Sequence, residues 1–308
     1  MQTTNTIFLV KPANLVFNAE TAASNAFQFA MNESKEVIMQ KAFQEFDAFV
    51  ETLRAKGINV IVFEDTKYPI KPDAIFPNNW ATFHSNGTVI LYPMFAPNRR
   101  HERRQDIIDT IKSNFSVNNI LDLSEYEKEN KFLEGTGSIV FDHESKIAYA
   151  CLSLRTNKDL FEKVCNFLQY KPVYFNSYDE SGKEIYHTNV MMCIGEKFAV
   201  ICLESIIDKK EKASVSQSLI ETGHQIVDIT YEQMNNFAGN MLALHTNDNK
   251  SILVLSRSSF DSLTTAQKNQ LEKYCELVPL PIKTIETIGG GSVRCMIAEV
   301  FLKPQTVE

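Results

Sequence analysis

The stretch His187–Leu203, HTNVMMCIGEKFAVICL, carries the pattern from which the architecture follows. A polar residue opens an apolar run, the turn Gly195–Lys197 comes next, and a second apolar run ends at Leu203. Two short apolar runs joined by a turn that contains glycine are typical of a β-hairpin. The same pattern recurs along the chain, so the sequence predicts a repeated unit.

Five copies of the unit open with polar residues at regular intervals. The opening residues are Asn79, Glu134, His187, Asn240 and Cys295. Their spacings of 55, 53, 53 and 55 residues are the mark of a repeat architecture. The fifth copy, Cys295–Leu302, has no second strand after it, and the early apolar run Thr6–Val10 can supply one. That pairing would close the five units into a ring.

Segments with apolar residues at helical spacing lie between the hairpins. These segments are Glu36–Lys56, Arg103–Phe115, Asp159–Gln169, Lys212–Thr222 and Thr264–Cys275, the last with Thr264 as its cap. The unit is therefore strand, strand, helix, strand. We expect an α/β fold, a five-bladed α/β propeller with pseudo-fivefold repeats around a central active-site channel. No linker or low-complexity tract interrupts the rhythm, which favours a single domain over residues 1–308.

Composition excludes several classes of protein. Hydrophobic residues make up 44% and charged residues 22% of the 308 residues, as in globular enzymes. The formal charge of −7 argues against a nucleic-acid or anionic-membrane partner. No basic region precedes the apolar run near the first residue, and no run reaches the ~20 apolar residues of a membrane span. The six cysteines lack C-x-x-C spacing, which suits reduced thiols in the cytoplasm.

Equivalent positions of a fivefold ring face the same channel, so the five opening residues should converge. Among them are a thiol, an imidazole and a carboxyl group, Cys295, His187 and Glu134. A polar residue at the head of an apolar strand is costly to bury without a partner or ligand. Together the three match a nucleophile, a base and a group that orients the base. The run Gly289–Gly291 before Cys295 leaves room for a ligand.

Other residues of the same types are assigned structural roles. The remaining cysteines are taken as packing residues, because free cysteine behaves as a small hydrophobic side chain. His84, His101, His143, His224 and His245 are taken as ordinary surface or core groups, and Asn240 as a structural hydrogen-bonding residue. The run Arg99–Arg104 is interpreted as a solvated helix start, with the alternative that one arginine binds a substrate carboxylate. No metal-binding or phosphate-loop motif is present.

Nearly end to end, the chain resembles the pentein, or guanidine-modifying, superfamily. This superfamily includes dimethylarginine dimethylaminohydrolases, arginine deiminases, amidinotransferases and citrulline hydrolase. Six segments carry the resemblance in order: Pro72–Asn79, Ala96–Arg100, Leu133–Gly135, Leu152–Asn157, Tyr186–His187 and Cys295. Each is weak alone, and their order makes the resemblance specific.

The resemblance implies roles for individual residues. Cys295 is the nucleophile, His187 the general acid and base, and Glu134 the acid that orients His187 or the substrate head group. Arg99 or Arg100, with Arg155, would hold the carboxylate of an amino-acid substrate, and Asp73 would help to seat that substrate. It implies neither a metal nor an organic cofactor. The polar loop Asn176–Lys183 precedes His187 and is the candidate lid.

The pair Asn78 and Asn79 departs from the dimethylaminohydrolase pattern, which has Glu-Asp there. Amides supply N–H donors that a neutral ureido oxygen needs and that a guanidinium, which has only donors, cannot use. The segments around Asn79, His187 and Cys295 are most similar to those of the citrulline hydrolase branch.

The implied function is a cysteine-dependent hydrolase that acts on the ureido group of citrulline. Its products would be ornithine, ammonia and carbon dioxide, formed through a covalent intermediate on Cys295. An arginine deiminase or a dimethylarginine dimethylaminohydrolase is the main alternative. Two less favoured alternatives are an amidinotransferase and a non-catalytic binding module of the same fold. The expected partner is a small amino acid. The sequence leaves open whether the protein forms a homo-oligomer.

Overall fold

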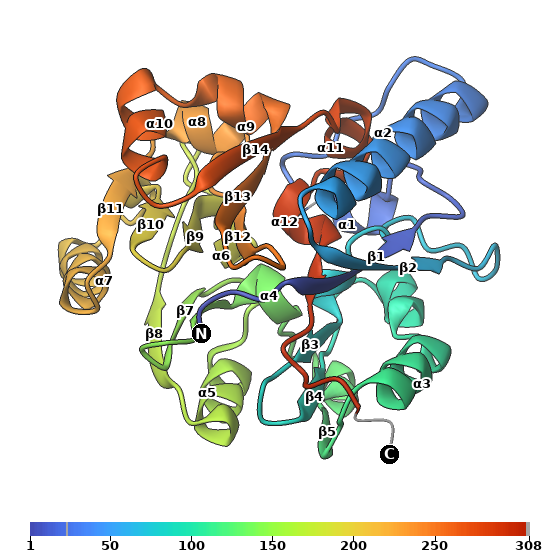
Figure 1. Cartoon of the computed structure of the whole chain (residues 1–308), viewed down its shortest axis with the longest axis horizontal. Coiled ribbons are helices and arrows are strands. Elements are labelled where there is room, and N and C mark those ends of the chain that lie inside the picture. The colour runs from blue at the N-terminus through green and yellow to red at the C-terminus, as the bar shows by residue number, and fades with distance from the viewer. Residues whose placement is uncertain (23, 306–308) are drawn as a thin grey trace.

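Five three-stranded sheets form a ring in the computed structural model, which describes residues 1–22 and 24–305 (Figure 1). In every sheet the inner strand pairs antiparallel with the middle strand, and the middle strand pairs parallel with the outer strand. The parallel pair needs a crossover, which a helix supplies. The predicted five-bladed α/β propeller is confirmed.

Each blade contains one of the five repeat positions. The Asn79 blade holds η1 (Pro77–Asn79), β3 (Ala81–Phe83), β4 (Thr88–Leu91), η2 (Pro97–Glu102), α3 (Gln105–Asn114), β5 (Asn119–Asp122) and η3 (Ser124–Glu129). The Glu134 blade holds α4 (Gly135–Ser138), β6 (Val140–Asp142), β7 (Ile147–Cys151), α5 (Lys158–Leu168) and β8 (Lys171–Phe175). The His187 blade holds α6 (Thr188–Met191), β9 (Met192–Ile194), β10 (Phe198–Ile201), η4 (Leu203–Ser205), α7 (Lys209–Glu221), β11 (Gln225–Asp228) and α8 (Tyr231–Asn235).

The remaining two blades have the same plan. The Asn240 blade holds β12 (Leu242–His245), β13 (Ser251–Ser256), α9 (Arg257–Ser262), α10 (Thr265–Leu271), β14 (Glu276–Leu280) and α11 (Lys283–Gly289). The Cys295 blade holds α12 (Val293–Met296), β15 (Ala298–Glu299), β1 (Thr6–Lys11), α1 (Ala19–Ala22), α2 (Lys35–Ala55) and β2 (Asn59–Glu64).

The fifth blade closes the ring with strands from distant parts of the sequence. β15 pairs antiparallel with β1, with Ile7 opposite Glu299 and Phe8 opposite Ala298. β1 then pairs parallel with β2 over its whole length. The predicted pairing of the fifth copy with the early apolar run is therefore confirmed.

Amphipathic helices cover the outer side of the ring, where Figure 1 shows α2, α3, α5, α7 and α10 at the periphery. In α2 the side chain of Ser34 caps the first turn by accepting from the backbone N–H of Val37. The residues α2 buries against the core recur at helical spacing and include Ala42, Phe46 and Phe49. The five predicted helices are confirmed, although α10 ends at Leu271, before the predicted end at Cys275, in a turn that leads to β14.

Asn240 leads into its strand, β12, as predicted, but the other four repeat positions do not head strands directly, and for them the prediction is wrong. Glu134 and His187 precede the single helical turns α4 and α6, and Cys295 lies within α12. In α4 the turn is closed by backbone hydrogen bonds from Gly137 and Ser138 to the carbonyl of Glu134. These turns lie near the centre of the ring in Figure 1. The residues of these turns, GTGS in α4, TNVM in α6 and VRCM in α12, run directly into the apolar strands, so the sequence pattern did not mark where each strand begins.

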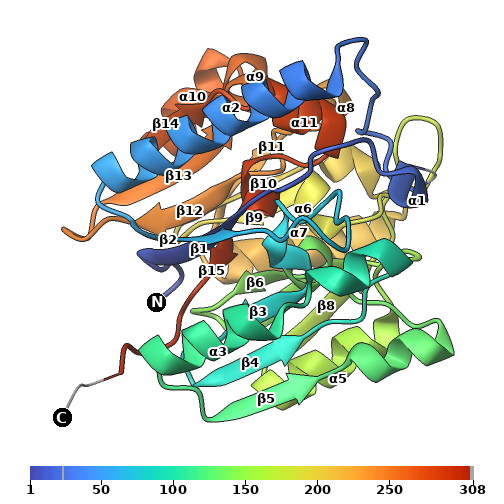
Figure 2. The same ribbon diagram turned by 90° about the vertical axis from the view of Figure 1, so that its right-hand side faces the viewer.

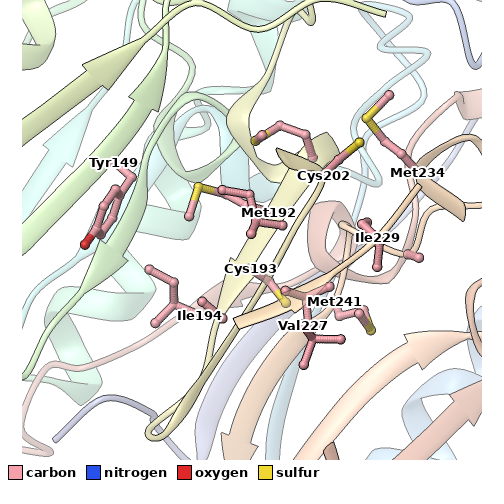
Figure 3. Close-up of a cluster of buried hydrophobic side chains, with 14 of the residues drawn as sticks. Tyr149, Met192, Cys193, Ile194, Cys202, Val227, Ile229, Met234 and Met241 are labelled. Carbon is pink, nitrogen blue, oxygen red and sulfur yellow. The ribbon is translucent and has the colours of Figure 1, made fainter. Parts of the chain in front are cut away.

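Sulfur-containing side chains fill much of the core around the His187 blade (Figure 3). Met192, Cys193 and Cys202 pack there with Met234 and Met241. Unbranched thioethers fill the irregular spaces where wedge-shaped blades meet, because their three torsions adapt to the available volume. None of the helices in the described part of the chain is both long and apolar enough to cross a bilayer.

One glycine allows the close approach of two neighbouring repeat positions. Gly135 has a φ of +47°, and a Cβ added there would collide with the backbone oxygen of Asn78. Gly182 also has a positive φ, +80°, but a Cβ there would meet nothing within 4 Å. A comparison of these two glycines therefore separates the cost of backbone strain from the cost of a steric collision.

We expect Gly135→Ala to destabilise the protein by about 3 kcal/mol or more, because it adds a collision with backbone to the left-handed backbone penalty. Gly182→Ala should cost only the backbone penalty of about 1–2 kcal/mol. Urea unfolding of both variants measures the difference. Equal losses would show that the contact at Gly135 does not constrain the fold.

Candidate active site

A small cavity lies where the repeat positions converge. Its lining residues are Asn25, Asp73, Phe76, Asn79, Arg99, Arg155, Tyr186, His187, Gly289, Gly290, Gly291 and Cys295. Asn25 follows α1, which Figure 2 shows at the end of the ring away from both labelled termini. The cavity volume is about 20 Å³, room for about one water molecule.

Glu134 is fully buried and directs the ring of His187. Its Oε2 lies 2.7 Å from Nε2 of His187, and its Oε1 accepts from the backbone N–H of Phe95 at 2.9 Å. Arg155 Nη1 approaches the same Oε2 at 3.5 Å and Arg99 Nη1 at 3.9 Å. Because Nε2 is engaged by the carboxylate, Nδ1 is the ring nitrogen left to exchange a proton with a ligand.

The protonation states of this pair follow from burial and neighbouring charge. Burial alone would raise the pKa of Glu134, but Arg155, His187 and Arg99 outweigh it and hold that pKa well below its usual range. Burial lowers the pKa of His187 to about 4, although Glu134 opposes the shift. At neutral pH the carboxylate is therefore ionised and the imidazole neutral, ready to accept a proton.

Two amide side chains hold the sulfur of Cys295. Asn240 Nδ2 lies 3.3 Å and Asn189 Nδ2 3.5 Å from Sγ. The amide of Asn240 has one orientation, because its Oδ1 accepts from the backbone N–H of Arg294 and its Nδ2 donates to the carbonyl of Asn189. The thiol in turn donates to Oδ1 of Asn240 at 3.6 Å. Asn240, which the sequence suggested to be structural, thus contacts the candidate nucleophile.

The other five cysteines line no part of this cavity and are free, buried thiols. Burial raises the pKa of Cys151, Cys165, Cys193 and Cys275 to about 12. It raises the pKa of Cys202 to about 11. They stay protonated at neutral pH, as packing residues do.

Arg99 enters the site with four of its five N–H groups already in hydrogen bonds. Its Nε and Nη2 donate to both carboxylate oxygens of Glu102, at 2.8 and 2.9 Å. Its Nη1 donates to Oδ1 of Asn79 at 2.9 Å, and Nη2 also reaches the carbonyl of Phe76. The arginine is 2% exposed, so a solvated helix start is the wrong interpretation of this residue.

The guanidinium of Arg155, which lines the cavity, has fewer hydrogen bonds than that of Arg99. Its plane lies over the ring of Tyr186, with Cζ 4.9 Å from the ring centroid. Nη2 donates to the carbonyl of Thr21 and to the hydroxyl of Ser24, and Nε has no hydrogen-bond partner among the described residues. Asp73, also in the lining, has Oδ2 paired with Asn18 at 2.8 Å and Oδ1 without a partner in the described chain.

Two predicted substrate-binding residues are not brought to the cavity. Arg100 is half-buried, pairs with Glu127 at 3.3 Å and donates to the carbonyl of Met94, on the far side of η2 from Arg99. Asn78 is buried behind the cavity, where its Nδ2 donates to the hydroxyl of Thr136. Consecutive residues of a 3₁₀ turn point in different directions, so only one residue of each predicted pair reaches the site.

The segment around α1 covers the cavity. Asn25 donates to the carbonyl of Gly290 at 3.1 Å, and Arg155 holds the same segment through Thr21 and Ser24. An amino acid is much larger than one water molecule, so the cavity must widen before a substrate can enter. The predicted lid, Asn176–Lys183, lies beside the covering segment and supplies no described lining residue.

Sequence reasoning did not single out Asn189, Glu102 or Asn25. For Asn189 the only sign in the sequence is its place two positions after the candidate base His187. Glu102 lies inside the basic run Arg99–Arg104, which the sequence predicts to be a solvated helix start. Asn25 lies outside the repeat, so no periodicity marks it. Among the described residues, no group of three or more His, Cys, Asp or Glu side chains is arranged to hold a metal ion.

Solved structures of guanidine-modifying enzymes share the fold. The N-terminal domain of ArgZ, bound covalently to a reaction intermediate, matches with a TM-score of 0.74 and 17% identity over 96% of this chain and 97% of that one. ArgZ is an arginine dihydrolase from the ornithine–ammonia cycle in cyanobacteria. DDAH from Pseudomonas aeruginosa, in complex with citrulline, matches with a TM-score of 0.67 and 13% identity over 97% of this chain and 100% of that one.

Unliganded AgrE has a TM-score of 0.76 and 15% identity over 98% of this chain. The chain spans only 40% of the AgrE chain and 41% of full-length ArgZ. At these identities the structural likeness establishes the fold and no substrate.

Membership of a family rests on sequence. None of the curated proteins compared with the chain matches it. A family model described as N,N dimethylarginine dimethylhydrolase, eukaryotic, matches residues 11–302, which is almost the whole chain. The chain therefore belongs to this family of hydrolytic guanidine-modifying enzymes, within the pentein superfamily.

Proposed function

We propose that the protein hydrolyses the ureido group of citrulline to ornithine, ammonia and carbon dioxide. The observation that carries the proposal is the amide of Asn79. Its Nδ2 is buried, has no partner among the described residues and lies beside His187, since a Cβ added at Gly137 would collide with both groups. A buried N–H without a partner is costly, and a ureido oxygen is an acceptor of the kind it lacks.

The first step uses the pair described above. Neutral His187 accepts the thiol proton of Cys295 at Nδ1, while the sulfur forms a bond to the ureido carbon. Asn240 and Asn189 hold the sulfur, and Nδ2 of Asn79 donates to the oxygen on which negative charge develops. Glu134 stabilises the imidazolium that results, as the acid of a catalytic triad does.

The second step releases an amine and restores the enzyme. Imidazolium His187 gives its proton to a nitrogen of the tetrahedral centre, the carbon–nitrogen bond breaks, and a thioester remains on Cys295. Water, deprotonated by His187, then attacks the thioester carbon and the sulfur leaves. The carbamate so released loses carbon dioxide. One water is consumed for each citrulline converted to ornithine, ammonia and carbon dioxide.

The amino-acid end of the substrate is assigned to two charged groups. Arg155 has an unpartnered Nε in the cavity lining and would bind the carboxylate once the covering segment moves. Asp73 has an unpartnered Oδ1 and would accept from the α-ammonium group. Burial raises the pKa of Asp73 against the pull of Arg99, and an adjacent ammonium would favour its ionised form.

Arginine is the second candidate substrate, and one observation favours it. Three buried carboxylates, Asp73, Glu102 and Glu134, surround only two guanidinium groups, Arg99 and Arg155. The excess of negative charge would attract a cationic head group. ArgZ, which shares the fold, is an arginine dihydrolase. A deiminase or dihydrolase reaction on arginine would use the same Cys295, His187 and Glu134.

A product assay distinguishes the candidates. We expect the purified protein to release ornithine from citrulline, and Cys295→Ser to abolish the reaction because the nucleophile is lost. Arginine and methylated arginines are assayed in parallel by chromatography. Cys165→Ser, which changes a buried cysteine in α5 outside the cavity, is the control and should keep at least about half the activity. Citrulline or ornithine formed from arginine alone would contradict the proposed substrate.

The acid limb of kcat/KM should have its midpoint near pH 4. The attack needs neutral His187, and kcat/KM reports the protonation of the free enzyme. The rate at pH 5.5 should therefore stay close to that at pH 7, whereas an unperturbed histidine, with a pKa of 6.5, would already have lost most of it. A midpoint near 6.5 would contradict a neutral, buried His187.

Stability must be followed over the same range. The unfolded chain binds the His187 proton near its ordinary pKa of 6.5, whereas the folded site resists it. This histidine therefore weakens folding as the pH falls from 6.5 toward 4. Circular dichroism at each pH separates loss of the fold from loss of the base.

A further inference from the structure

Arg99 and Glu102 form a buried pair beside the cavity whose purpose the reaction steps leave unexplained. Glu102 is 2% exposed and does not line the cavity. Its two oxygens accept from Nε and Nη2 of Arg99, which fixes the plane of the guanidinium. The remaining contacts of Arg99 include Oδ1 of Asn79 and the carbonyl of Phe76. A carboxylate of a substrate finds no parallel pair of free N–H groups on it.

This arrangement dictates how the amide of Asn79 is turned. A guanidinium offers only donors, so the atom of Asn79 that faces Arg99 must be the oxygen. Turning the amide over would place its NH₂ group against a cation that also donates. The nitrogen is therefore held on the opposite side, next to His187, where it lacks a partner among the described residues.

We propose that Arg99, held in place by Glu102, is a positioning residue that makes Asn79 present only N–H donors to the head group of the substrate. This inference rests on the proposed function and names the origin of its specificity. A free amide can expose either its oxygen or its nitrogen, and so can serve an acceptor or a donor. With its oxygen engaged by Arg99, Asn79 complements a ureido oxygen and opposes a guanidinium N–H.

Glu102 is needed because Arg99 has competing partners close by. Nε of Arg99 lies 3.6 Å from Asp73, and Nη1 lies 3.9 Å from Glu134. Without the bidentate contact to Glu102, the guanidinium could turn toward either carboxylate and release the amide oxygen. Glu102 thus keeps Arg99 aimed at Asn79 and leaves Glu134 to pair with His187 and Arg155.

The test compares ligands that differ only in the head group. In a Cys295→Ser background, dissociation constants of citrulline and arginine are measured by calorimetry, so that no turnover occurs. The double variant Arg99→Met/Glu102→Met removes both charges together and leaves neither ion buried without its partner. We expect the preference for citrulline over arginine to fall by about tenfold to a hundredfold, because Asn79 becomes free to turn.

The matched control is the pair Arg103 and Glu127, a second bidentate pair that does not line the cavity. Arg103→Met/Glu127→Met should leave the ratio of the two dissociation constants within about twofold of the parent. A merely structural role of Arg99 would weaken both ligands equally in its double variant and leave their ratio unchanged. That result would overturn the inference.

A milder variant keeps the test decisive if the double variant does not fold. Glu102→Gln retains the shape of the side chain and replaces one acceptor oxygen by a donor, so the clamp on Arg99 loosens. The ratio should fall by about threefold to tenfold, and an unchanged ratio would overturn the inference. Failure of the unmodified protein to form ornithine from citrulline rejects the proposed function instead, because the binding ratios are measured without turnover.

Discussion

The site depends on the burial of one charge, the carboxylate of Glu134. An ionised carboxylate away from water is stable only when other groups replace its lost hydration. Here a backbone N–H, an imidazole and two guanidinium groups do so. His187 is thereby fixed with a proton on Nε2 and Arg155 across the ring of Tyr186, while Glu102 holds Arg99 toward Asn79. One ion pair network thus sets the geometry of base, substrate clamp and amide together.

Charge and hydrogen-bond pattern give different indications about the head group. The excess of carboxylates around the cavity favours a cation at a distance, whereas the donor of Asn79 favours an acceptor in contact. Coulombic attraction changes slowly with distance and is reduced when residues such as Asp73 and Glu102 bind a proton. An unpaired buried donor has no comparable way to relax. The contact therefore carries more weight in choosing between a ureido and a guanidino group.

The repeat spacing was sufficient to predict the ring, its closure by the early strand, and the meeting of Cys295, His187 and Glu134. Those features follow from apolar periodicity and from symmetry, which a sequence displays directly. The helical turns at the repeat positions were not predictable, because each is only four residues long and runs directly into an apolar strand. The roles of Arg99 and Asn240 depend on which neighbour each side chain meets. Sequence separation of 20 residues between Arg99 and Asn79 gives no sign of that contact.

Closure of the ring by β1 and β15 has a consequence for how the protein is made. Ile7 pairs with Glu299, so β1 waits for almost the entire chain before its second neighbour exists. Contacts between such distant residues require most of the chain entropy to be lost first, and they form late. Cys295 lies immediately before β15, so the nucleophile arrives with the strand that seals the ring. A chain synthesised only as far as the fourth blade therefore lacks both Cys295 and the strand that closes the ring, so the site cannot be complete before the ring is.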